Sequence, residues 1–143
     1  MDERLEIGLK GSEFKRALEE QFESVKKEFD LKKVDIEVLY YLSDCDCDNT
    51  PTDIYKRLKL NRGHVSQAID DLVKRGYIIA MSDAKDRRSV HYVVTSYAKP
   101  LVHKIAVLRE ELDHKIFDGI TEQEIAVYKK VTYKILQNID TLR

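Results

Sequence analysis

Two short helices, each with its own start signal and joined by a tight turn, restrict the fold of this chain more than any other feature. Thr50 is a favourable N-cap, Pro51 suits the first helical position, and Asp53 stands in for the acidic residue of a capping box. Asn61 caps the second helix, and Gly76 follows its end as a left-handed terminator. Two capped helices this close together predict a helix-turn-helix.

Two β-rich apolar runs follow the second helix. They read YIIAM at 77–81 and VHYVV at 90–94, and each has the composition of a strand. The eight residues between them, SDAKDRRS, carry too many charges for a core and predict the tip of a hairpin, the wing. This order predicts a winged helix-turn-helix, so the expected fold class is mainly α with a small antiparallel β-hairpin.

Amphipathic helices are expected on both sides of this module. Apolar residues at spacings of three and four predict helices over 12–29 and 101–117, and the apolar run VDIEVLYYL predicts a largely buried helix over 34–42. A capping box at 121–124 (TEQE) begins the last helix. The terminal helices carry more apolar surface than one small winged helix can cover. We therefore expect a single domain over 1–143, with a winged helix-turn-helix part at 31–95 and helical dimerisation parts at 1–30 and 96–143.

The distribution of charge is more informative than its sum. The chain has a formal net charge of −1, but residues 56–88 hold nine basic and four acidic side chains and sum to +5, which leaves −6 for the other residues. A basic window on an acidic scaffold suits a protein of which one face meets phosphate. Ordinary scatter of surface charge is the alternative, and charge alone does not decide between them.

The start of the second helix is the first candidate DNA-binding surface. A recognition helix enters the major groove with its N-terminal residues, which must be polar, basic or small. Arginine bonds guanine or phosphate, glutamine bonds adenine, and serine bonds either base type. A glycine there lets the backbone approach closely, and a histidine can touch phosphate. The candidates are Asn61, Arg62, Gly63, His64, Ser66 and Gln67.

The wing supplies a second candidate surface, made of Lys85, Asp86, Arg87 and Arg88. An arginine in a narrow minor groove reads the width of the groove rather than base identity. Asp86 can hold one of the two arginines in shape through a bidentate ion pair. A solvated hairpin tip with a local salt bridge is the alternative, and the presence of wing and helix in the right order favours DNA contact.

The chain resembles the MarR family of bacterial transcription regulators. The most specific segments are LNRGHVSQAIDDLVKRGYI at 60–78, which is similar to the family's recognition helix, and DAKDRR at 83–88, which is similar to its wing. Val94-Thr95 followed by a long helix resembles the family's exit from the wing. Two features depart from the pattern: Gly63 stands where the family usually has a larger residue, and Ala98 where a glycine often follows the threonine.

This resemblance implies an obligate homodimer with the terminal helices as its dimerisation layer. It implies two recognition helices in successive major grooves of a pseudo-palindromic operator, with Arg88 in the minor groove and Asp86 beside it. It also implies a repressor that a small phenolic ligand, a metal or an oxidant releases from DNA. Tyr40 and Tyr41 could line a pocket for such an effector, although helix residues in an apolar run are more often core.

Cys45 and Cys47 form a Cys-x-Cys pair in the loop SDCDCDN at 43–49. Flanking aspartates should raise the pKa of these thiols, which disfavours a redox switch. Two thiolates among carboxylates suit a divalent ion, and the pair resembles the one in the ArsR family of metal sensors. In that family the pair lies inside the first helix of the motif, whereas Cys47 precedes the cap Thr50. The simplest interpretation is two small residues in an acidic loop. We keep both cysteines as possible sensing residues, with an ArsR-like metal-responsive repressor as the alternative function, and predict no metal site and no cofactor.

Other classes of protein receive less support from the sequence. No phosphate-binding loop, nucleophile elbow or HExxH motif is present, so an enzyme is not expected. No apolar run is long enough to span a bilayer and no secretory h-region is present, which predicts a cytoplasmic protein with no membrane contact. A winged helix that binds another protein is the rival of a different class, and the basic wing argues against it.

Overall fold

The computed structural model describes residues 3–4, 6, 11–44, 48–82, 85 and 88–143. The chain divides into two compact units, Met1–Leu112 and Asp113–Arg143. Helices dominate both units, and a two-stranded antiparallel sheet lies in the first. The expected fold class is thereby confirmed.

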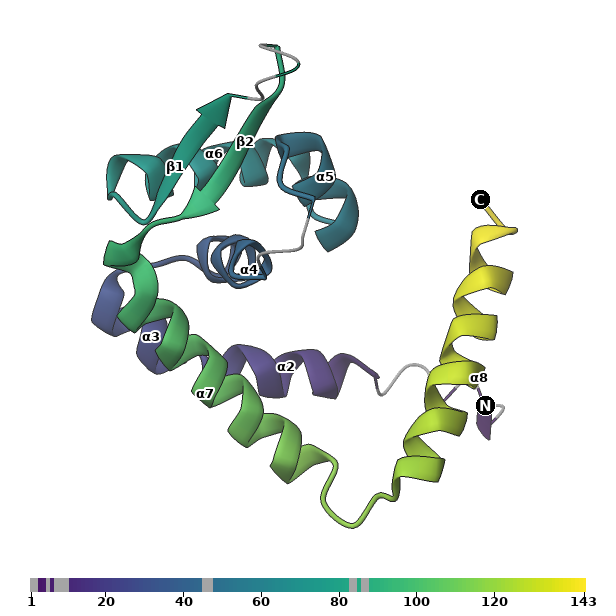
Figure 1. The fold of residues 1–143 in the computed structure, drawn as a ribbon. Helices are drawn as coiled ribbons and strands as arrows, with labels where there is room; N and C mark the ends of the chain where they lie inside the picture. Colours follow the sequence, from purple (N-terminus) through teal and green to yellow (C-terminus); the bar gives the residue numbers. More distant parts are fainter. Residues whose placement is uncertain (1–2, 5, 7–10, 45–47, 83–84, 86–87) are drawn as a thin grey trace. The chain divides into compact units, whose positions relative to one another are not determined.

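The first unit contains the winged helix. Helices α4 (Lys33–Leu42), α5 (Pro51–Leu58) and α6 (Arg62–Lys74) precede strands β1 (Ile78–Ser82) and β2 (Val90–Val94). The strands pair in antiparallel register, with Ile78 opposite Val94 and Ser82 opposite Val90. In Figure 1 the hairpin lies against α6 at the top of this unit, with α5 beside it and α4 below.

The same unit contains helices that lie outside the winged helix in sequence. These are α2 (Gly11–Gln21), α3 (Glu23–Phe29) and α7 (Lys99–Ile116), the last of which follows a 3₁₀ turn at Ser96–Ala98 and continues past Leu112 into the second unit. One apolar core joins α3 and α7 to the winged helix. Its fully buried side chains include Val25 of α3, Leu39 of α4, Ile54 of α5, Leu72 of α6, Ile78 of β1, and Leu101 and Ile105 of α7.

The predicted start signals are confirmed by the hydrogen bonds. Thr50 Oγ1 accepts from the Asp53 amide (3.2 Å) while the Asp53 carboxylate accepts from the Thr50 amide (3.3 Å), which forms a capping box at α5. Asn61 caps α6, and Thr121 with Glu124 forms a capping box at the start of α8 (Glu122–Asp140). The hydrogen bonds from Thr121 also lower the pKa of the Glu124 carboxyl.

Three predicted boundaries are wrong in detail. The helix expected over 12–29 breaks at Phe22 into α2 and α3. Its apolar spacing continues through the break, so periodicity cannot detect it. The first strand begins at Ile78 because the amide of Tyr77 bonds the Leu72 carbonyl at the end of α6 (3.0 Å). The long helix α7 begins at Lys99 rather than Leu101, with Pro100 in its first turn, where its missing N–H has no helical partner to lose.

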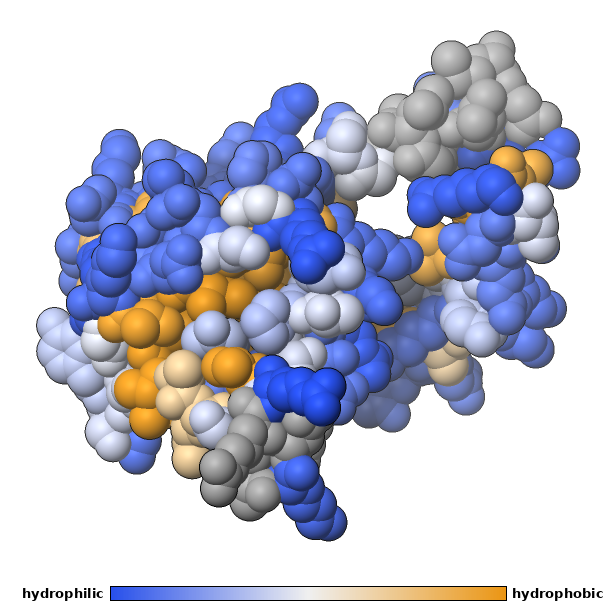
Figure 2. Space-filling view, turned by 90° about the horizontal axis from the view of Figure 1, so that it is seen from above, coloured by the Kyte–Doolittle hydropathy of each residue, from blue (hydrophilic) through white to orange (hydrophobic). Residues whose placement is uncertain are grey.

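The outer face of the hairpin is partly apolar. Ile79 and Met81 alternate along β1 and are 48% and 51% exposed. Figure 2, seen from above relative to Figure 1, shows apolar residues gathered in one area of this face and hydrophilic residues around it.

The second unit consists of the last turn of α7, Gly119 in a left-handed conformation, and helix α8 (Glu122–Asp140). No residue of α8 is buried within the described chain. None of the helices in the described segments is long and apolar enough to cross a membrane.

Candidate nucleic-acid interface

Helix α6 separates a buried face from an exposed polar face. Its apolar residues Val65, Ala68, Ile69 and Leu72 are buried against α4, α5 and β1. All six residues predicted to read DNA from this helix are exposed, namely Asn61, Arg62, Gly63, His64, Ser66 and Gln67. The structure therefore brings the predicted set together on the solvent side of the helix, at and just after its N-terminus.

The N-cap constrains the first turn of α6. Asn61 Oδ1 accepts from the amides of Gly63 (2.8 Å) and His64 (3.2 Å). A Cβ placed on Gly63 would lie 3.2 Å from Asn61 Oδ1, which is a tight contact. The Asn61 side chain is thus occupied by the cap, and the glycine leaves it room.

Two of the predicted base-reading side chains have partners within the winged helix. The Arg62 guanidinium lies over the ring of Tyr55, 5.7 Å from its centroid. Gln67 Nε2 donates to Asp71 Oδ1 (3.1 Å), one turn further along α6. This contact orients the Gln67 amide. Both side chains are therefore pre-positioned on the exposed face.

The wing is described only in part. Lys85 and Arg88 are exposed, whereas Asp86 and Arg87, and with them the predicted ion pair of Asp86, lie outside the described residues. The base of the hairpin is tied to the end of α6, because Thr95 Oγ1 donates to the Gly76 carbonyl (2.6 Å) and the Thr95 amide donates to the Tyr77 carbonyl (3.0 Å). These hydrogen bonds of Thr95 therefore hold the base of the wing against the end of α6.

Basic side chains beside the predicted set were not singled out from the sequence. Lys56, Arg57 and Lys59 are exposed at the end of α5, next to the turn that leads into α6. Arg57 pairs with Asp48 (3.2 Å). In the sequence these residues belong to the basic segment 56–88, which has a net charge of +5. The predicted site covers only the recognition helix and the wing, so it leaves them out.

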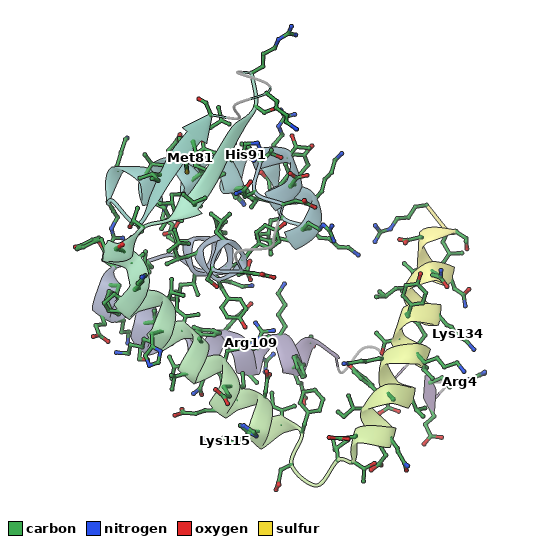
Figure 3. The ribbon with its side chains drawn as sticks, in the orientation of Figure 1. Arg4, Met81, His91, Arg109, Lys115 and Lys134 are labelled. Atoms are coloured by element: carbon green, nitrogen blue, oxygen red, sulfur yellow. The ribbon has the colours of Figure 1, made fainter. Side chains whose placement is uncertain are left out.

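A cavity of about 970 Å³ lies beneath the winged helix, within the first unit. Tyr40 and Tyr41 both line it, so the pocket interpretation of these tyrosines is supported, and Tyr40 is not a core residue because it is 37% exposed. The Arg109 guanidinium from α7 lies over the Tyr40 ring, 5.2 Å from its centroid. Arg109, labelled in Figure 3, is a residue of this cavity that the sequence did not reveal.

The walls of the cavity are apolar and its rim is charged. The apolar lining residues are Leu18, Phe22, Ile36, Leu58, Leu60 and Ile105. An ion pair between Lys33 of α4 and Glu19 of α2 (2.5 Å) lies at the rim. The hydrogen bond and positive charge of Lys33 lower the pKa of Glu19. The cavity could therefore hold a small molecule with an apolar body and a charged or polar end.

The proposed sensing residues Cys45 and Cys47 lie outside the described residues. Within the described part of the chain, no group of three or more His, Cys, Asp or Glu side chains is arranged to hold a metal ion. Neither the cysteine hypothesis nor the metal-sensor alternative gains support from the fold.

Comparison with known proteins agrees with this geometry. A family model described as a winged helix DNA-binding domain matches residues 31–98. The transcriptional regulator PrsX of Escherichia coli is 22% identical over 91 residues, which are 64% of this chain and 55% of PrsX. The transcriptional regulator AdcR of Streptococcus pneumoniae is 33% identical over 55 residues, 38% of each chain. The chain thus matches about half the length, or less, of these relatives.

Solved structures match over nearly the full length. The transcriptional regulator PA3341 has a TM-score of 0.82 at 22% identity, covering 94% of this chain and 98% of that one. A MarR-family regulator of Listeria monocytogenes in complex with a 26mer DNA has a TM-score of 0.79 at 24% identity, covering 97% and 89%. Streptococcus pneumoniae FabT in complex with DNA has a TM-score of 0.73 at 23% identity, covering both chains fully.

Residues 31–98 therefore have the fold of a winged helix and match the family model of a winged helix DNA-binding domain. The chain as a whole has the fold of the MarR-family regulators, which confirms the resemblance seen in the segments at 60–78 and 83–88.

Proposed function

We propose that this protein is a sequence-specific DNA-binding transcriptional regulator that acts as a homodimeric repressor. The observation that carries the proposal is the division of α6, where four apolar residues are buried while every predicted base-reading residue is exposed at the N-terminal end. A helix that presents such residues at that end suits the major groove. The matching structures of FabT and of the Listeria monocytogenes regulator, which share this fold, are complexes with DNA.

The two contact surfaces have different roles in this proposal. Arg62, Ser66 and Gln67 read base edges in the major groove. Arg88 enters the minor groove and reads its width, and Lys85 adds attraction to phosphate. The exposed Lys56 and Lys59 beside the helix-turn-helix would contact the phosphate backbone.

A second copy of the chain would cover the apolar side chains that the protomer exposes on α8. Tyr128, Val131 and Ile135 are 57%, 48% and 51% exposed, and they recur at helical spacing. Two linked modules also gain affinity through effective concentration, since the second contact becomes intramolecular. Half-sites roughly 10 bp apart are the geometric expectation for a two-fold dimer of such modules.

The cavity lined by Tyr40, Tyr41 and Arg109 would hold the effector that releases DNA. Its apolar walls and its Arg109 guanidinium favour a small amphipathic molecule with an acidic group. Such a ligand can shift DNA affinity only if it binds the DNA-free form more tightly than the DNA-bound form.

The decisive experiment is footprinting on the DNA upstream of the protein's own reading frame, at low salt. We expect protection of a pseudo-palindrome and a steep fall in affinity with salt. Lys56→Ala should reduce the slope of log K against log salt by about 1, whereas Lys27→Ala on α3 should leave it unchanged. No protected site, or binding that is insensitive to salt, would favour the rival function of a winged helix that binds protein.

A further inference from the structure

Three consecutive residues, Asp48, Asn49 and Thr50, connect the helix-turn-helix to the wing. Thr50 caps α5, and the Asp48 carboxylate pairs with Arg57 on the same helix (3.2 Å). Asn49 makes two bonds to β2: its carbonyl accepts from the Tyr92 amide (3.1 Å), and its Oδ1 lies 2.6 Å from Nδ1 of His91. His91 is labelled on β2 in Figure 3. A displacement of this segment would therefore move both the start of α5 and the second wing strand.

The same segment is bonded to the wall of the cavity. The Tyr41 hydroxyl donates to the Asp48 carbonyl (2.6 Å), and the Tyr41 side chain lines the cavity from α4. Tyr40 lines the same cavity, but its ring lies under Arg109 of α7. Tyr41 thus contacts the segment 48–50, which is bonded to the wing strand β2, whereas Tyr40 contacts α7.

We infer that Tyr41 is a positioning residue that couples the cavity to the wing. Its hydroxyl holds the backbone at Asp48 in place, and the two bonds between the neighbouring Asn49 and β2 fix the strand relative to it. A cavity occupant with an acceptor group would compete for the Tyr41 proton and weaken the hold on the segment. This inference rests on the proposed function, because it assigns the regulation of DNA contact to one hydrogen bond of the cavity wall.

The hydrogen bond can be tested without knowing the effector. Tyr41→Phe removes the hydroxyl and keeps the ring, and Tyr40→Phe makes the same change one residue earlier. In Tyr41→Phe, amide hydrogen exchange should rise about threefold at Tyr92, whose amide bonds Asn49, and in the first turn of α5. Tyr40→Phe should exchange like the wild type at these amides. Equal exchange in all three proteins would overturn the inference.

DNA binding tests whether the hydrogen bond acts through the wing. Tyr41→Phe should weaken binding to the protected operator about threefold. In an Arg88→Ala background, where the wing contact is already lost, the same substitution should have little further effect. In a Gln67→Ala background the full threefold loss should remain, because α6 reads the bases independently. A general loss of stability would instead weaken binding equally in both backgrounds, and that result would refute the role in the wing.

The outcomes separate this inference from the proposed function. If the wild-type protein fails to bind DNA, the proposed function fails, while the exchange rates still decide whether Tyr41 holds the segment. If the wild type binds DNA and Tyr40→Phe and Tyr41→Phe lower affinity equally, the effect belongs to the cavity as a whole and the inference is wrong.

Discussion

Gln67 and Arg88 are exposed on two different elements, and their replacement should have different consequences. Gln67→Ala removes a side chain placed to read a base edge, so it should cost about 1–3 kcal/mol on the operator and relax the preference at particular base pairs. Arg88→Ala removes the charge that is proposed to read groove width, so it should weaken binding on all sequences and reduce the salt slope by about 1. Competition assays against a set of single-base operator variants measure both effects.

The control for this comparison is Asp71→Asn, which changes the partner of Gln67 without removing Gln67 itself. Because Gln67 Nε2 donates to Asp71 Oδ1, the neutral amide still offers an oxygen to it, and base preference should be retained. Identical losses on every sequence for Gln67→Ala and Arg88→Ala would contradict the division of roles between helix and wing.

Asp35 is a buried carboxyl in the first turn of α4, 5% exposed, and it accepts a hydrogen bond from the Lys32 amide (2.8 Å). Burial raises its pKa, the Lys32 hydrogen bond opposes this, and the nearby Asp71 raises the pKa further. A raised pKa in the folded state means that the folded protein binds this proton more tightly than the unfolded protein. The contribution of Asp35 to stability is therefore most favourable in acid and decreases as pH rises through the folded pKa.

Asp35→Asn should consequently raise the melting temperature at pH 7, since the amide keeps an acceptor for the Lys32 amide and carries no buried charge. The difference from the wild type should shrink as pH falls and vanish below the ordinary carboxyl range, where Asp35 is protonated in both states. Thermal unfolding followed by circular dichroism between pH 3 and 8 measures it; a variant that is less stable than the wild type at pH 7 would contradict the expected sign.

At the level of elements, local signals located the helix-turn-helix and failed where structure depends on distant contacts. The caps Thr50 and Asn61 and the terminator Gly76 are local chemistry, and each lies where it was expected. The break at Phe22 leaves the apolar spacing intact, so no local pattern marks it. Tyrosine is common in strands, but the amide of Tyr77 donates to a carbonyl at the end of α6, so Tyr77 does not begin the strand. Propensity describes what a residue tolerates, and tertiary hydrogen bonds decide between the tolerated states.

The first turn of α5 offers a matched test of the cap. Thr50→Ala removes the side-chain oxygen that accepts from the Asp53 amide, which should cost about 1 kcal/mol of unfolding free energy. Thr52 lies two residues later on the same turn and is exposed, so Thr52→Ala should stay within roughly 0.5 kcal/mol of the wild type. Urea unfolding with a common slope for all three proteins gives the comparison. Equal stability of the two variants would show that the cap contributes nothing.

At the level of the whole molecule, the sequence placed the predicted DNA-binding residues on one helix and one wing and suggested Tyr40 and Tyr41 as pocket residues, but it could not reveal the rest of the cavity. Its key contacts join residues far apart in the chain, such as Arg109 with Tyr40. Such pairs leave no periodic signal, because each residue alone is compatible with a surface position. The Tyr41–Asp48 bond is closer in sequence but crosses a loop, and loop conformation does not follow from periodicity.

In the proposed function, dimerisation would turn one weakly binding winged helix into an operator-binding protein. Ile135→Glu adds a negative charge to the exposed apolar face of α8, and Gln137→Glu adds the same charge two residues away, on the opposite side of the helix. An unpaired charge buried in an interface costs about 3 kcal/mol, and a two-fold axis repeats the cost. The dissociation constant of the dimer should rise at least about a thousandfold in Ile135→Glu and stay unchanged in Gln137→Glu.

Sedimentation at micromolar concentration distinguishes these outcomes, and a wild-type protein that sediments there as a folded monomer would refute the dimer. If Ile135→Glu unfolds instead of dissociating, the melting temperature of the wild type decides: it must rise with protein concentration for a dimer, because association stabilises only the folded chain. Operator affinity should fall along with the dimer in Ile135→Glu, even though the substitution leaves α6 and the wing untouched, because the second contact then loses its effective concentration.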